Sequence, residues 1–89
     1  MERSVVVRVV VTNPNGVHAR PSHAVVSAAR DFQAKVELHC DGRRADARSI
    51  LAVMTLGAAQ GTEIEVHASG ADAEAAAERI AELLSEAEA

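Results

Sequence analysis

The sequence lacks a long apolar run, an N-terminal secretion signal and a polybasic segment. These absences argue against a membrane span, export and nucleic-acid binding, and we expect a cytoplasmic protein. Cysteine is almost absent: Cys40 is the only one, which excludes a disulfide within the chain. Its 89 residues have room for one modest core but no large enclosed active site. We therefore expect a single domain over residues 1–89, without a catalytic cleft of its own.

Positive charge is scarce at the end of the chain. The first 61 residues hold eight Lys and Arg against five Asp and Glu, whereas the rest holds one against eight. The net charge of −4 therefore conceals a positive first part that includes Arg20, Arg30 and Arg48. We expect these three to give a locally positive face for an acidic partner. A solvated surface of mixed charge is the alternative, above all for Arg43 and Arg44.

Alternation of apolar and polar residues predicts four strands, each with one buried face. They cover Val5–Thr12, Ala34–Cys40, Arg43–Ala47 and Glu63–Ala68. Helical periodicity predicts three helices, over Ala19–Asp31, directly after Ser49 and over Asp72–Glu86. The order is βαββαβα, and strands patterned on one face favour an antiparallel sheet. We therefore expect an α+β fold, an open-faced β-sandwich whose four-stranded antiparallel sheet is covered on one face by three helices.

The segment Gly16-Val17-His18-Ala19-Arg20-Pro21 places a histidine just before a predicted helix. Proline is tolerated at the first helical position and an apolar-periodic run follows it, so His18 falls at a helix N-terminus. The free N–H groups of such a terminus and the guanidinium of Arg20 both suit phosphate oxygens. A phosphoryl group on His18 would be held there, although on this motif alone a polar loop histidine is the simpler interpretation.

A second motif begins at Ser49, which opens a short apolar stretch that ends in Gly57. Ser49 suits the N-cap of a short helix, and Gly57 supplies the left-handed residue that ends one. A helix of two turns cannot bury every side, so we expect Ile50, Leu51 and Met54 to be partly exposed beside the site. The remaining large apolar residues of the stretch are assigned to the core: Val53 and Leu56.

With these two motifs about thirty residues apart, the sequence resembles HPr, the histidine-containing phosphocarrier protein of the bacterial phosphoenolpyruvate-dependent sugar phosphotransferase system. The resemblance covers nearly the whole chain and implies the same fold. It implies that enzyme I, charged by phosphoenolpyruvate, passes a phosphoryl group to Nδ1 of His18, which becomes a pros-phosphohistidine stabilised by Arg20. The A component of a sugar permease then removes it. The protein would be a monomeric carrier that needs no cofactor, and not an enzyme with its own small-molecule substrate.

The resemblance also assigns regulation and docking. It implies regulatory phosphorylation of Ser49, which in one branch of the family is carried out by a dedicated serine kinase/phosphorylase. Docking of partner proteins is expected at six positions: Ala19, His23, Arg48, Ile50, Leu51 and Met54. Two alternatives remain open, a phosphocarrier of the nitrogen-type branch and a regulatory binding module controlled through Ser49. Relatives of the second kind lack the histidine that is present here.

The four histidines and the cysteine do not suggest a metal site. His39 and His67 fall on the polar faces of their strands, whereas Cys40 falls on a buried face. His23 follows His18 by five residues, which is not a helical ligand spacing. We expect these side chains to point in different directions and to bind no metal.

Overall fold

The computed structural model describes residues 3–13 and 19–85. The elements are, in order, β1 (Ser4–Val10), α1 (Ala19–Arg30), β2 (Lys35–Cys40), β3 (Arg43–Asp46), α2 (Ile50–Thr55), β4 (Glu63–Ser69) and α3 (Ala73–Ser85). The expected βαββαβα order is confirmed, and each boundary lies within two residues of its prediction wherever the structure describes it. The predicted end of the last helix at Glu86 lies outside the described residues.

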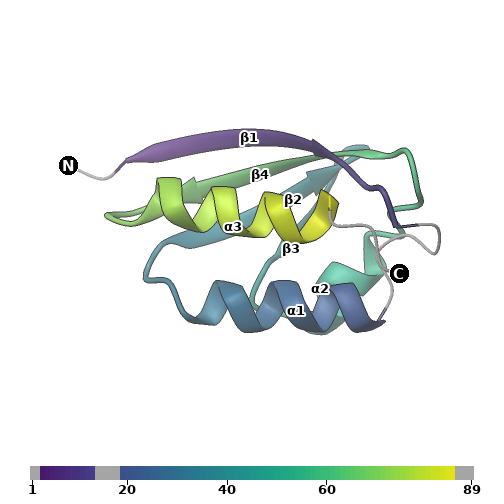
Figure 1. Cartoon of the computed structure of the whole chain (residues 1–89), viewed down its shortest axis with the longest axis horizontal. Coiled ribbons are helices and arrows are strands. Elements are labelled where there is room, and N and C mark those ends of the chain that lie inside the picture. Colours follow the sequence, from purple (N-terminus) through teal and green to yellow (C-terminus); the bar gives the residue numbers. More distant parts are fainter. Residues whose placement is uncertain (1–2, 14–18, 86–89) are drawn as a thin grey trace.

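The four strands form one antiparallel sheet in the order β1-β4-β2-β3. Figure 1 shows the three helices on one side of this sheet, with α1 and α3 side by side and α2 next to the first half of α1. The other side of the sheet carries no helix in the described part of the chain. The predicted open-faced α+β sandwich is therefore confirmed.

The core lies between the sheet and the helices. Leu38 and Ile64 enter it from β2 and β4, and Ile80 enters it from α3, each with no exposed surface. Val53 and Leu56 are buried as predicted. For the strand residues Leu38 and Ile64, burial follows from alternation, because successive side chains of a strand point to opposite faces.

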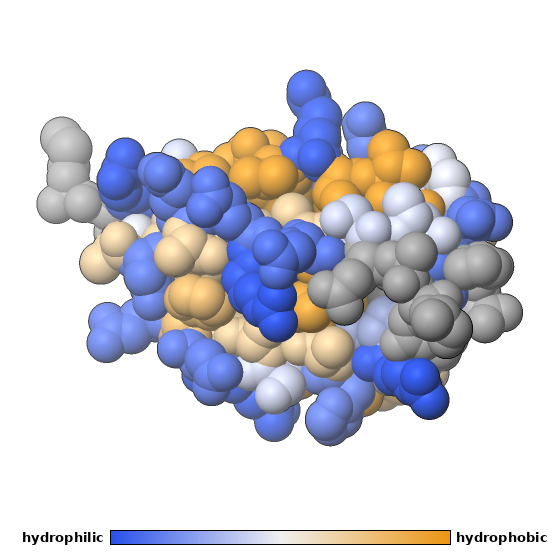
Figure 2. Space-filling view, viewed as in Figure 1, coloured by the Kyte–Doolittle hydropathy of each residue, from blue (hydrophilic) through white to orange (hydrophobic). Residues whose placement is uncertain are grey.

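The edge strand β1 is less buried than the sequence predicted. Val5, Val7 and Val9 are only partly buried, since just one side of their strand is paired and covered. Their neighbours Val6 and Val10 are exposed. Figure 2 shows apolar surface along the top of the molecule, where β1 runs in the same view in Figure 1. The predicted strand continued to Thr12, whereas β1 ends at Val10. β1 is therefore an edge strand with apolar side chains on both of its faces.

Two connections fix the positions of the strands and of α3. Asp41 and Gly42 have φ of 49° and 79°, which is the left-handed conformation that a two-residue hairpin between β2 and β3 requires, as predicted. Before α3, the Asp72 carboxylate accepts the backbone N–H groups of Ala34 at 2.7 Å and Gln33 at 2.9 Å. These two hydrogen bonds, the one from Gln33 first, lower the pKa of Asp72. They tie the start of α3 to the start of β2.

Among the described residues, no helix is both long enough and apolar enough to cross a membrane.

Candidate functional site

The helix α1 begins at Ala19, the residue directly after His18, which itself lies outside the described residues. Pro21 stands in the first turn, two residues later than the first helical position predicted for it. A proline in this turn removes no helical hydrogen bond, because the first N–H groups of a helix have no partner within it. Arg20, exposed in the same turn, is close in sequence to the predicted phosphoryl acceptor. The free N–H groups of this turn point out of the N-terminal end of the helix.

Ser49 caps α2 as predicted. Its backbone is extended, with φ −111° and ψ 110°, and its Oγ accepts the N–H of Ala52 at 3.2 Å. At the other end Gly57 has φ 63°, the left-handed conformation that ends a helix. Arg43 adds a contact that the sequence analysis missed, because its Nη1 donates to the carbonyl oxygen of Leu56 at 3.3 Å. The short helix is thus held at both ends by side chains and turns outside it.

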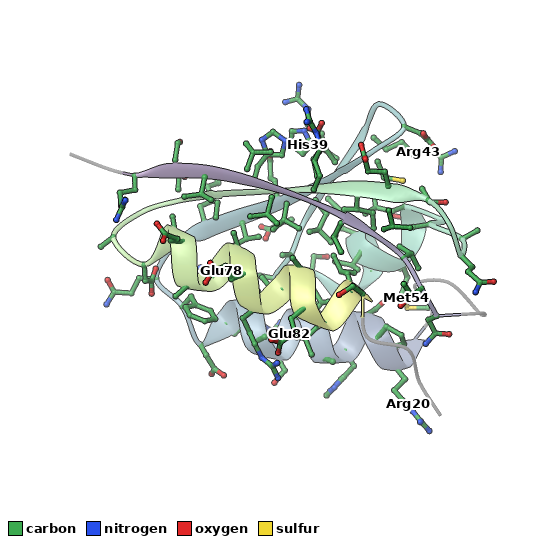
Figure 3. The ribbon with its side chains drawn as sticks, turned by 45° about the horizontal axis from the view of Figure 1, so that its top comes forward. Arg20, His39, Arg43, Met54, Glu78 and Glu82 are labelled. Carbon is green, nitrogen blue, oxygen red and sulfur yellow. The ribbon has the colours of Figure 1, made fainter. Side chains whose placement is uncertain are left out.

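The outer side of α2 is apolar and exposed, as the length of the helix predicted. Leu51 is 71% exposed, Met54 41% and Ile50 39%. A hollow of about 290 Å³ between the two helices is lined by Ile50 from α2 and by His23 and its neighbours from α1. In Figure 3, Met54 and Arg20 lie at the same end of the molecule. Two of the predicted docking residues, His23 and Ile50, therefore line the same hollow.

Arg30 and Arg48 lie away from this end. Arg30 is the last residue of α1, and its Nη2 donates to the carbonyl oxygen of Arg48 at 3.3 Å. Arg48 in turn donates from Nη2 to the carbonyl oxygen of Phe32 at 2.7 Å. A helix of 12 residues is about 18 Å long, so these cations do not gather around the first turn with Arg20. The three arginines therefore do not form one cluster at the first turn, although Arg30 lines the same hollow as His23 and Ile50, and the expected positive face stays a prediction.

A second cluster lies on the open face of the sheet. Figure 3 shows His39 on the side away from the helices, and its ring stacks on that of His67, with centroids 3.7 Å apart and planes 15° from parallel. Nε2 of His39 is 2.9 Å from Oε1 of Glu37, and Nε2 of His67 is 2.9 Å from Oε1 of Glu65. The expectation that the histidines point in different directions is therefore wrong for this pair.

The strand register explains why the four side chains meet. Glu37 is paired with His67 and His39 with Glu65 across β2 and β4, so all four project from one face at neighbouring positions. The hydrogen bonds with the histidines are the largest of the influences that lower the pKa of Glu37 and of Glu65. The Glu-x-His spacing in each strand was visible in the sequence, but the pairing of the two strands was not.

The family described as "PTS HPr component phosphorylation site" matches residues 5–86. The phosphocarrier protein HPr from Bacillus anthracis is 36% identical, with a TM-score of 0.87 over 91% of this chain and 96% of that one. HPr from Thermoanaerobacter tengcongensis is 31% identical, with a TM-score of 0.85 over 90% of each chain. Crh, the Bacillus subtilis catabolite repression HPr, is 35% identical, with a TM-score of 0.70 over 92% and 98%.

Proposed function

Because the chain belongs to the HPr family of phosphotransferase-system phosphocarriers, we propose that it takes a phosphoryl group from enzyme I onto His18. It then passes this group to the A component of a sugar permease. Members of this family carry phosphoryl groups and do not turn over a substrate of their own. The reaction takes place in the cytoplasm, where phosphoenolpyruvate charges enzyme I.

The proposed transfer needs an unprotonated nitrogen on His18. Its Nδ1 lone pair forms a bond to phosphorus while the bond between phosphorus and the donor in enzyme I breaks, and the donor keeps that electron pair. The transition state is loose and carries its charge on the phosphoryl oxygens, so positioning and charge stabilisation matter most. Arg20 and the N–H groups of the first turn of α1 are suited to both tasks. In the second transfer the acceptor group of the A component attacks the phosphorus, the N–P bond breaks, and Nδ1 of His18 regains its lone pair.

The observation that best supports this proposal is the exposed apolar side of α2, at the same end of the molecule as Arg20. A relay protein must dock on at least two partners, and its docking surface stays exposed between encounters. Leu51 is the most exposed large apolar residue of the described chain, although nothing in its own helix requires an apolar side chain at that position. The proposed docking surface is therefore built on the exposed apolar side of α2, with Ile50, Leu51 and Met54, and on His23, which lines the hollow beside Ile50. The two other expected docking residues, Ala19 and Arg48, stay in the proposal on the family resemblance alone.

Leu51→Ser tests this docking surface. We expect the concentration of the variant that gives half-maximal charging by enzyme I to be at least about tenfold higher than for wild type, because an exposed interface anchor is lost. Val6→Ser is the matched control, since Val6 is also an exposed apolar residue but lies on β1. Equal charging curves for the two variants, with both folded, would contradict the assignment of α2 as the docking surface.

The branch of the family and the role of Ser49 are tested separately. A panel of A components from sugar permeases and from the nitrogen-type branch, offered to the charged protein, distinguishes the two by the rate at which each removes the phosphoryl group. A regulatory binding module would instead accept an acid-stable phosphate on Ser49 from ATP and a serine kinase, without charging by enzyme I. The similarity to Crh favours testing this alternative alongside the first.

A further inference from the structure

The cluster on the open face of the sheet is not used by the proposed phosphoryl transfer. Its members come from two adjacent strands, His39 and Glu37 from β2 and His67 and Glu65 from β4. One ring nitrogen of each histidine and one carboxylate oxygen of Glu65 lie within 4.8 Å of one another. Three potential ligand atoms thus lie close together on one patch of the surface.

We propose that His39, His67 and Glu65 bind one divalent late transition-metal ion, of which Zn²⁺ is the representative. Two imidazoles and one carboxylate are a ligand set that such ions take up, with water in the fourth position. In a tetrahedral site the ligand atoms lie about 3.4 Å apart, so the three atoms need to move inwards by less than about 1 Å each. The two rings are stacked 15° from parallel, so their in-plane lone pairs do not point at a common centre, and binding also requires at least one ring to turn out of the stack. Both histidine side chains are partly exposed, which leaves room for this rotation.

The neighbours of the cluster fit this role. Oε2 of Glu65 accepts from Nε of Arg8 at 3.3 Å, and Oε1 lies 2.9 Å from Nε2 of His67. A metal ion bound to Oε1 would replace this hydrogen bond with His67, while Arg8 keeps the other oxygen in place. Glu37 holds Nε2 of His39, and a carboxylate behind a ligand histidine fixes the ring and strengthens its bond to the metal. Two surface hollows border the cluster: one of about 420 Å³ is lined in part by His39 and Glu65, and one of about 200 Å³ is lined in part by Glu37 and His67.

Hard cations are not expected to bind in the same way. Mg²⁺ and Ca²⁺ prefer oxygen ligands and several carboxylates, whereas this cluster offers two nitrogens and has an arginine beside its carboxylate. The ligand atoms of the proposed site therefore favour late transition-metal ions over Mg²⁺ and Ca²⁺. It also lies on the open face of the sheet, so it does not depend on the phosphocarrier role of the chain.

Calorimetric titration of the full chain with Zn²⁺ tests the proposal. We expect one ion per chain, and no comparable binding of Mg²⁺. His39→Gln and His67→Gln should each weaken Zn²⁺ binding at least about 100-fold, and Glu37→Gln about 10- to 100-fold, since an outer partner contributes less than a ligand. His23→Gln is the matched control and should leave the affinity unchanged, because His23 is an exposed histidine on α1.

Far-UV circular dichroism in the presence of a chelator checks that each variant is folded. If a glutamine variant does not fold, the test uses the wild-type chain: NMR follows the ring resonances of its four histidines during the Zn²⁺ titration. Shifts confined to His39 and His67 support the site. Absence of 1:1 binding, shifts confined to His18 and His23, or an affinity that His23→Gln abolishes would each overturn it.

Discussion

Ser49 has a structural role that can be separated from its proposed regulatory one. Its Oγ accepts the N–H of Ala52 at 3.2 Å and so satisfies one of the free donors at the start of α2. Ser49→Ala removes this acceptor and should lower the free energy of unfolding by about 1 kcal/mol. For a chain of this size that corresponds to a fall in the midpoint of thermal unfolding of about 4–8 °C. Ser49→Asp keeps a good N-cap and should retain most of the stability.

The two variants should then separate in the charging assay. Ser49→Ala should be charged by enzyme I at nearly the wild-type rate below its unfolding temperature, because the apolar side of α2 is unchanged. Ser49→Asp should be charged more slowly, because it places a negative charge next to Ile50 and Leu51 on the proposed docking surface. Thermal unfolding and initial charging rates are measured on the same preparations. Equal stability of Ser49→Ala and wild type, or equal charging of both variants, would refute this reasoning.

Two further predictions concern stability. Ser22 is fully buried in α1, and its Oγ has no hydrogen-bond partner among the described residues, so Ser22→Ala should raise the free energy of unfolding by about 1 kcal/mol. The exposed Ser27 of the same helix is the control, since Ser27→Ala gains only helix propensity. Urea unfolding measures both variants, and a larger stability gain for Ser27→Ala than for Ser22→Ala would contradict this prediction. The pKa of Asp72 is lowered in the folded protein, so its charged carboxylate stabilises the fold. This contribution is fully present above the unfolded-state pKa of about 3.9 and is lost as the pH falls through the folded-state pKa. Asp72→Asn should therefore lose stability less steeply than wild type as the pH falls below about 4. Unfolding midpoints at several pH values measure this. Parallel curves for the two proteins would show that the two backbone hydrogen bonds do not make stability depend on the charge of Asp72.

Much of the fold follows from local patterns in the sequence. Alternation fixes the strands, the Asp41-Gly42 pair fixes the hairpin, and Ser49 with Gly57 delimits α2. These signals are readable because each depends on residues that are close together in the chain. The one-sided burial of the sheet follows from the same alternation.

What the sequence did not reveal depends on contacts between distant segments. The contact of Arg43 with Leu56, the bracing of α1 by Arg48 and the convergence of His39 with His67 all join residues that are ten or more positions apart. Strand register decides which polar side chains of a sheet become neighbours, and no local pattern states the register of non-consecutive strands such as β2 and β4. For this reason the phosphate motif was identified by its spacing, whereas the histidine cluster was not.

The central claim is that His18 carries the phosphoryl group. The most direct test is the intact mass of the purified protein after incubation with phosphoenolpyruvate and enzyme I, for wild type and for His18→Ala. We expect one added phosphoryl group in the wild type that is lost in mild acid, because an N–P bond is acid-labile, and none in the folded variant. An adduct of equal yield in His18→Ala, or an acid-stable adduct in the wild type, would contradict it.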